Sequence, residues 1–390
     1  MHTIKILYLR PFSYKAYGAE EQDLKAGLTI LRKIKDFEIL DIQLDLKNNN
    51  LLFDPPYLIS DYKLNLSDKL KYIKNKFLTF DRAMTQAYTY KNYQIITQIR
   101  KNLRIDVIFT NTVSMVLFGD SKQIKHIHRS VSFEPIYVLK AVDSKIKAIL
   151  HSLLKLLSIR KELKCNTILS ISPRDANYYK RLRKFMGSCN IEVVPLRQFF
   201  NFKENAIIKK MCSQTSFGFL GSTYNVLHNR KSLEFVLSEI PPNFWGENDI
   251  FLNIYGRKIP VGINSNGNIK INNWVDSIED IYRQNICFLV PFFLASGMQS
   301  KVFEPLMRGK ILICDPRVLS GYNFTPYIHY LPAKTGKEFM NSIKWVIQNI
   351  ESANIIASNA ARHANSIIGP EIIENTIINS IYNVVKKYSA

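Results

Sequence analysis

The chain has 390 residues, of which 46% are hydrophobic, and a formal net charge of +21. This length predicts two domains that can each bury a core, and the composition excludes a disordered chain. No run approaches the roughly 18–20 apolar residues of a membrane-spanning helix, and the first residues lack the apolar region of a signal peptide. Five cysteines without a Cys-x-x-Cys pair are expected to be buried free thiols. We therefore expect a cytoplasmic protein.

Strand-like and helix-like segments alternate along the first half of the chain. Strands are expected at Ile4–Leu9, Phe37–Gln43, Val107–Thr110, Ile124–Val131, Thr167–Ser172 and Ile191–Pro195. Helices are expected at Ala19–Ile34, Ala83–Leu103 and Leu139–Lys164, and Ser172 and Pro173 have the residue types of a helix N-cap and first turn. This alternation predicts a mainly parallel sheet covered by helices on both faces.

A second run of the same kind follows residues 197–214, which lack periodicity and are expected to form a linker. Strands are expected at Phe217–Leu220, Ile250–Tyr255, Cys287–Val290 and Ile311–Cys314, and helices at Asn229–Ile240, Ser277–Gln284, Lys337–Ile350 and Pro370–Lys387. The sequence therefore predicts an α/β protein with two Rossmann-like domains, 1–200 and 201–368. A C-terminal helix, 369–390, could pack back on the first domain.

Residues 286–315 are the most informative stretch of the chain. A glycine-containing polar turn, followed by a helix that begins near Ser300, lies between two short apolar strands. Open parallel sheets bind phosphate-bearing ligands where strands end and helices begin. The stretch resembles the donor-nucleotide motif of GT-B glycosyltransferases, particularly the retaining family 4. The resemblance covers most of residues 105–335 and implies the GT-B fold, in which two Rossmann-like domains with parallel sheets face a central cleft.

The resemblance implies a nucleotide-sugar site in the second domain. Lys301 would stabilise the departing diphosphate, and Glu304 would accept hydrogen bonds from the ribose. Outside the motif, favourable placement in the helix dipole would explain Glu304, and Lys301 could be an ordinary solvated lysine. Trp274 and Val275 would lie against the base, although Trp274 could instead be a core residue. The other expected donor contacts are Gly221, Ser222, Arg230, Ser296, Gly297, Met298, Gln299, Ser300 and Val302. Ser296 replaces a second glutamate that the family often has.

In the first domain the resemblance places His128 beside the donor sugar as a catalytic residue. Alternation along Ile124–Val131 predicts that His126, His128 and Ser130 share one face of a strand, and a satisfied half-buried histidine is the alternative. The acceptor would contact Gly18, Arg129 and Glu134. No third ligand accompanies the histidine pair and no Asp-x-Asp pair occurs, so neither a metal nor another cofactor is expected.

The positive charge is concentrated in residues 1–200, which contain 34 Lys and Arg against 18 Asp and Glu. The segment Leu139–Lys164 is both basic and amphipathic. It predicts either a core helix with a solvated basic face or an interfacial helix that binds anionic lipid. A peripheral position on the inner face of the cell membrane is therefore one expectation.

The expected reaction is transfer of a hexose from a UDP- or GDP-sugar to a hydroxyl of a glycan or lipid-linked saccharide. The resemblance implies retention of configuration and a role in polysaccharide or glycoconjugate synthesis at the cell surface. Two alternatives stay open. One is a basic nucleic-acid-binding protein, favoured by the charge and by 20 tyrosines, although no nucleic-acid motif is recognised and no such partner is expected. The other is a nucleotide-sugar epimerase of the same tandem fold.

Overall fold

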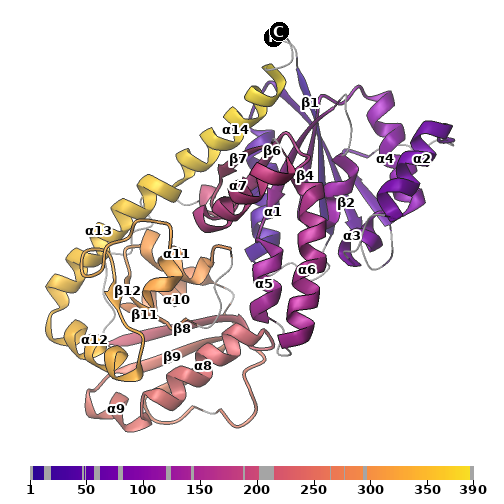
Figure 1. Cartoon of the computed structure of the whole chain (residues 1–390). Coiled ribbons are helices and arrows are strands. Elements are labelled where there is room, and N and C mark those ends of the chain that lie inside the picture. The colour runs from indigo at the N-terminus through magenta and orange to yellow at the C-terminus, as the bar shows by residue number, and fades with distance from the viewer. Residues whose placement is uncertain are drawn as a thin grey trace. The chain divides into compact units, whose positions relative to one another are not determined.

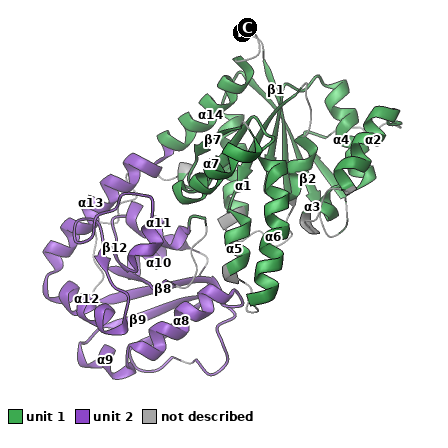
Figure 2. Cartoon of the chain, in the orientation of Figure 1, with its two compact units in different colours: residues 1–200, 296–298, 371–390 green, residues 201–295, 299–370 purple. Residues whose placement is uncertain are grey.

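The computed structural model describes residues 3–12, 19–45, 48, 50–56, 62–77, 82–119, 124–141, 145–187, 189–201, 215–263, 265–275, 277–292 and 297–386. The chain divides into two compact units (Figure 2). The first comprises residues 1–200, 296–298 and 371–390, and the second comprises residues 201–295 and 299–370.

The first unit contains a seven-stranded sheet with the order β3-β2-β1-β4-β5-β6-β7 (Figure 1). Its strands are β1 (Ile4–Phe12), β2 (Phe37–Asp45), β3 (Asn50–Asp54), β4 (Val107–Asn111), β5 (Lys125–Ser130), β6 (Thr167–Ser170) and β7 (Asn190–Val193). Among these described strands only the β2–β3 pair is antiparallel. The six parallel strands are those predicted. The edge strand β3 was missed because its residues are only half-buried or exposed.

Helices flank this sheet (Figure 1). They are α1 (Ala19–Arg32), α2 (Leu66–Phe77), α3 (Arg82–Ala87), α4 (Tyr90–Asn102), α5 (Glu134–Ala141), α6 (Lys145–Glu162), α7 (Pro173–Met186) and the C-terminal α14 (Pro370–Lys386). The helix predicted over 83–103 is two helices, because Thr89 caps α4 by accepting a hydrogen bond from Asn92 N. The predicted start of α7 is confirmed, since the Ser172 hydroxyl accepts a hydrogen bond from Asp175 N.

The second unit contains a six-stranded sheet with the order β10-β9-β8-β11-β12-β13. Its strands are β8 (Ser216–Thr223), β9 (Phe251–Arg257), β10 (Ile269–Asn273), β11 (Cys287–Val290), β12 (Ile311–Cys314) and β13 (Leu331–Pro332). All the described neighbours are parallel, so their carboxyl ends share one edge. The helices are α8 (Leu227–Glu239), α9 (Pro242–Glu247), α10 (Ile278–Gln284), α11 (Ser300–Met307), α12 (Gly336–Gln348) and α13 (Ile350–Ile368). The predicted α/β class, with two mainly parallel sheets, is confirmed.

Each sheet has its own apolar core. In the second unit every residue of β11 and β12 is buried, which matches the two apolar runs in the sequence. Trp245 of α9 is also fully buried in this core, beside Phe217 of β8. The central strands are therefore rigid supports for the loops and helix starts at their carboxyl ends.

Candidate functional site

The sheet of the second unit changes direction between β8 and β11. From β8 the chain continues to β9 on one side, and from β11 it continues to β12 on the other. At such a topological switch point the loops after the two strands separate and leave room for a ligand. Helix α8 follows β8 and helix α11 follows β11, so both helices begin at this edge.

Both helix starts lack a side-chain cap. In the described chain, neither Val226 before α8 nor Gln299 before α11 makes a side-chain cap hydrogen bond. By contrast, Ser277 caps α10, and Thr335 caps α12 with a complete capping box. The first amide groups of an uncapped helix carry the positive end of its dipole and can bind an anion.

Lys301 joins the two helix starts. Its Nζ donates a hydrogen bond to Asn229 Oδ1 at 3.0 Å, and Asn229 Nδ2 donates to Thr223 O at 3.0 Å. Burial lowers the pKa of Lys301 to about 8, so most of these ammonium groups remain charged at pH 7. Burial, followed by the repulsion of Lys301, lowers the pKa of His228 to about 4, so this imidazole is neutral. The junction therefore presents one positive charge.

Glu304 lies one turn further along α11. Its Oε1 accepts hydrogen bonds from Arg308 Nε at 3.3 Å and Nη2 at 3.2 Å. Arg308 also donates to Glu279 and lies 4.6 Å from the Tyr282 ring centroid. Burial raises the pKa of Glu304, and Arg308 opposes that rise. Sequence reasoning missed Arg308, although its position four residues after a glutamate on a helix favours such a pair.

Trp274 is not a core residue. Its side chain is 39% exposed, and the Arg257 guanidinium lies 4.0 Å from its ring centroid. Arg257 ends β9 and Trp274 follows β10, so the pair lies at the same carboxyl edge as the starts of α8 and α11. The core alternative for Trp274 is therefore wrong. Val275 is half-buried beside it. Arg257 was missed, although its place at the end of a predicted strand was a usable signal.

Gly221 has a packing reason for being glycine. Gly256 of β9 has φ +140°, and a Cβ there would lie 1.9 Å from Gly221 O. A Cβ on Gly221 would lie 2.7 Å from the Tyr224 ring, whose hydroxyl donates to Tyr255 O. The close approach of the two strand ends explains Gly256, and the packing of the Tyr224 ring explains Gly221 without a ligand. Ser222 beside Gly221 is exposed.

The other predicted donor contacts have varied positions. Arg230 is exposed and pairs with Glu234 of its own helix at 3.7 Å. Ser300 is half-buried at the start of α11, and Val302 is fully buried in that helix. Ser296 lies outside the described residues.

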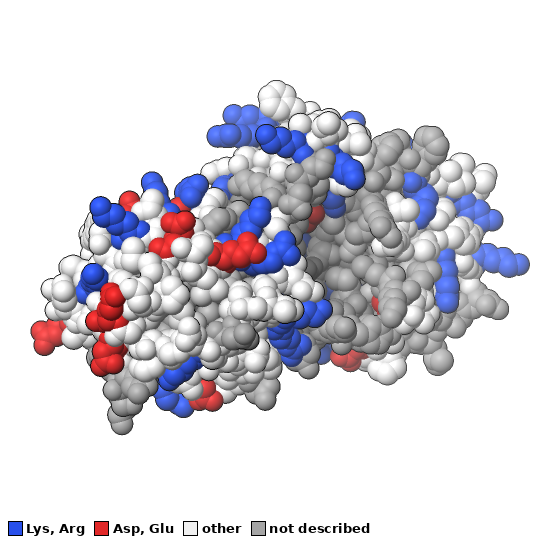
Figure 3. Space-filling model, turned by 90° about the horizontal axis from the view of Figure 1, so that it is seen from below, with Lys and Arg blue, Asp and Glu red and all other residues white. Residues whose placement is uncertain are grey.

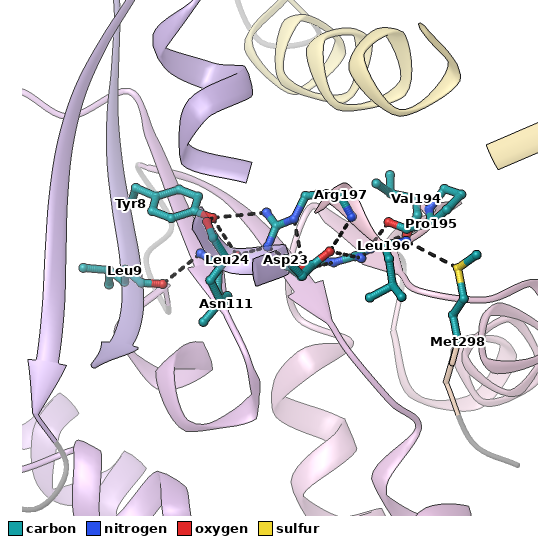
Figure 4. Close-up of polar contacts among 11 residues, drawn as sticks. Tyr8, Leu9, Asp23, Leu24, Asn111, Val194, Pro195, Leu196, Arg197 and Met298 are labelled. Carbon is teal, nitrogen blue, oxygen red and sulfur yellow. Dashed lines mark hydrogen bonds and ion pairs between the residues drawn. The ribbon is translucent and has the colours of Figure 1, made fainter. Parts of the chain in front are cut away.

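Gly297 and Met298 belong to the first unit, although α11 follows them in the chain. Gly297 has φ +66° and donates its N–H to Asp175 Oδ2 at 3.0 Å. Leu196 N lies 3.4 Å from Met298 Sδ, and Met298 is buried (Figure 4). In this structure the Gly297 amide therefore has a protein acceptor.

His128 belongs to β5 of the first unit and is fully buried. Its Nδ1 lies 3.0 Å from Thr110 Oγ1, and its Nε2 lies 3.4 Å from Glu162 Oε2. His126 shares Thr110 Oγ1 at 2.7 Å, and Ser130 reaches the same face through Tyr179, so the predicted common face is confirmed. Both ring nitrogens of His128 face protein atoms in the core. The structure therefore does not show His128 in an open site for a sugar.

Arg129 is also fully buried, and its predicted acceptor contact is wrong. It donates to Asp23, Val194 O and Pro195 O, while Arg197 bonds Asp23 from the other side at 2.8 Å (Figure 4). Burial alone would raise the pKa of Asp23, but the two arginines lower it to about 2. This cluster ties α1 to β5 and to the segment after β7.

Gly27 of α1 was a sequence signal for this cluster that the sequence analysis did not use. A glycine within a helix costs stability, and at this position a Cβ would lie 2.2 Å from Arg197 Nη1. Gly18 lies outside the described residues. Glu134 accepts a hydrogen bond from Ser132 Oγ at 2.8 Å and pairs with Lys155 at 3.4 Å. Its contacts therefore connect the start of α5 to α6.

The described residues contain neither a metal-binding cluster nor a membrane-spanning helix. No group of three or more His, Cys, Asp or Glu side chains there could hold a metal ion. None of the helices in the described ranges is long and apolar enough to cross a bilayer.

Comparison with known proteins gives a structural likeness only. No protein-family model matches the sequence, and no curated protein matches it. Sucrose-phosphate synthase from Thermosynechococcus elongatus has a TM-score of 0.65 at 12% identity, over 98% of this chain and 100% of that one. HepE from Anabaena in complex with UDP-glucose has a TM-score of 0.63 at 12% identity, over 97% and 100%.

An epimerase has the same architecture. The putative UDP-N-acetylglucosamine 2-epimerase from Listeria monocytogenes has a TM-score of 0.55 at 11% identity, over 98% of this chain and 97% of that one. At these identities the comparisons show the fold, which is of the GT-B type with two Rossmann-like units. They do not assign the chain to glycosyltransferase family 4.

Proposed function

We propose that the protein is a glycosyltransferase that moves a hexose from a UDP- or GDP-sugar to a hydroxyl of a glycan or lipid-linked saccharide. One observation carries the proposal: Lys301 of α11 meets Asn229 of α8 at the topological switch point, between two helix starts without side-chain caps. Backbone amides and one ammonium group there suit a diphosphate. The GT-B fold also supports a function in glycosyl transfer.

The proposed reaction is a substitution at the sugar C1. The bond between the sugar C1 and the diphosphate oxygen breaks, and its electron pair remains on the diphosphate. A bond then forms from C1 to the acceptor oxygen, whose proton passes to the departing diphosphate. Lys301 and the α11 amides stabilise the charge that develops on the leaving group. Glu304 accepts from the ribose, and Trp274 with Arg257 lies against the base. Retention of configuration is taken from the resemblance of residues 286–315.

Thermal denaturation with UDP, GDP and ADP tests nucleotide binding directly. We expect stabilisation by UDP or GDP that Lys301→Met removes, because the variant loses the charge at the junction. Release of the nucleoside diphosphate from matching sugar donors should then require an acceptor and should continue in EDTA. Absence of stabilisation by all three nucleotides, together with tight oligonucleotide binding, would favour the nucleic-acid alternative.

An epimerase is the second candidate, because the GT-B likeness includes the Listeria protein. The two reactions differ in their need for an acceptor. An epimerase would convert or hydrolyse a UDP-sugar in the absence of any acceptor, and proton NMR of the sugar would detect the new isomer. A glycosyltransferase would leave most of the donor unchanged under the same conditions.

A further inference from the structure

Helix α6 presents five of its large apolar side chains to solvent. Ile146, Ile149, Leu150, Leu153 and Leu157 are between 47% and 82% exposed. Their spacing of three or four residues places them in one stripe along the helix. The opposite face packs against the unit and contains the small buried residues Ala148 and Ser152. The apolar stripe therefore does not lie in the core, whereas Ile159 near the end of the helix does.

Helix α2 repeats this arrangement. Leu66, Leu70 and Ile73 are between 58% and 73% exposed and also form one stripe, whereas Asn75 on the opposite side is buried. The two helices are neighbours, because Lys161 Nζ of α6 donates a hydrogen bond to Asn75 Oδ1 of α2 at 3.0 Å. We call the exposed stripes of these two helices the α2/α6 face.

The charges beside this face have one sign. The exposed charged residues within α2 and α6, as far as their side chains are described, are Lys69, Lys74, Lys145, Lys147 and Arg160. Neither acidic residue of the two helices adds an exposed, unpaired negative charge. Asp68 pairs with Lys101 at 2.6 Å, and Glu162 is buried. In Figure 3, most of the visible Asp and Glu side chains gather at one end of the view, whereas Lys and Arg are spread across it.

We propose that the α2/α6 face binds an anionic phospholipid membrane, with the apolar stripes inserted at the level of the headgroups. Five large apolar side chains in one stripe of α6 and three in one stripe of α2 exceed the scattered exposure that is normal for a soluble surface. Lysines beside such a stripe attract acidic lipid headgroups. An uncharged apolar partner would not explain why every described exposed charge of the two helices is positive. The inference goes beyond sugar transfer and does not depend on it.

Vesicle flotation tests this inference. At 0.1 M NaCl we expect the protein to float with phosphatidylcholine vesicles that contain phosphatidylglycerol, and not with pure phosphatidylcholine. Binding should weaken at 0.5 M NaCl because salt screens the lysines. Leu150→Ser with Leu153→Ser, and separately Leu66→Ser with Leu70→Ser, should each reduce the apparent vesicle affinity, by roughly ten-fold per leucine.

The matched control is Ile355→Ser on α13, because Ile355 is 62% exposed but lies in the second unit. It should float like the unaltered protein. All variants should keep the melting temperature and the response to UDP, so a failure of membrane binding is separable from a failure of the proposed function.

Three results would overturn the inference. The first is no flotation with anionic vesicles, and the second is equal flotation with neutral ones. The third is a dimer in sedimentation equilibrium that the leucine variants dissociate while flotation is unchanged, which would assign the face to a second copy of the chain.

Discussion

Replacing Lys301 by methionine tests how much the positive charge at the junction of α8 and α11 contributes to UDP binding. Methionine keeps most of the side-chain length but cannot donate to Asn229 Oδ1 or to a phosphate oxygen. A charge-assisted hydrogen bond contributes about 1.5–3 kcal/mol, so we expect UDP to bind roughly 10- to 100-fold more weakly. The apo protein should not be destabilised. The lowered pKa of Lys301, about 8 against a usual 10.5, means that folding penalises its charge by up to about 3 kcal/mol at pH 7.

The same pKa predicts a pH dependence with a definite sign. With a pKa of about 8, about nine-tenths of the Lys301 side chains carry a proton at pH 7 and about one-tenth at pH 9. UDP affinity of the unaltered protein should therefore fall roughly five- to ten-fold between these pH values. In the absence of ligand, the contribution of Lys301 to stability changes in the opposite direction. Its folding penalty is present below pH 8 and disappears as the pH rises toward 10.5.

Isothermal titration of UDP at pH 7 and pH 9 measures the affinity of each variant and its pH dependence. The Lys301→Met variant should bind weakly at both pH values and should lack the five- to ten-fold change. Lys344→Met is the matched control, since Lys344 is exposed on α12 and its Nζ lies 5.6 Å from the Phe244 ring centroid. The reasoning is refuted if Lys301→Met binds UDP like the unaltered protein, or if the pH dependence survives in the variant.

Three further predictions concern single side chains. Glu304→Gln loses the carboxylate that Arg308 orients, so UDP affinity should fall roughly ten-fold in titration calorimetry, and an unchanged affinity would remove Glu304 from the site. Trp274→Ala loses the stacking surface beside Arg257 and should weaken UDP binding roughly five-fold or more, whereas ribose 5-phosphate should bind as before. Asp23→Ala leaves two arginines buried without their carboxylate and should cost about 3–5 kcal/mol in urea unfolding. Because the pKa of Asp23 is about 2, its contribution should persist above pH 4 and be lost as the pH falls through 2, and acid unfolding with no such difference between Asp23→Asn and the unaltered protein would contradict this.

Much of the fold was predictable because its signals are local. The bounds of Cys287–Val290 and Ile311–Cys314 are those expected from two apolar runs. The start of α11 at Ser300 followed from the polar turn before it, and the start of α7 followed from Ser172 and Pro173. Such patterns act within a few residues, so neighbouring residues in the sequence suffice to read them.

The candidate site was predictable only in part. Lys301 and Glu304 were found because they lie within one short motif that resembles a known one. Arg308 and Arg257 were missed, since their roles depend on a helix turn and on a neighbouring strand. His128 and Arg129 were placed on the expected strand, yet alternation along a strand does not tell how deeply either face is covered.

By itself, the sequence determined where most strands and helices lie and that the chain folds as two α/β units. Periodic burial and helix caps are properties of short segments, and they need no knowledge of distant partners. Only the tertiary structure decided that Lys301 reaches Asn229 and that Asp23 holds two arginines from far along the chain. It also decided that the leucine stripe of α6 faces outward. The physical reason is that strand order and helix docking bring together residues whose separation in the sequence carries no local signal.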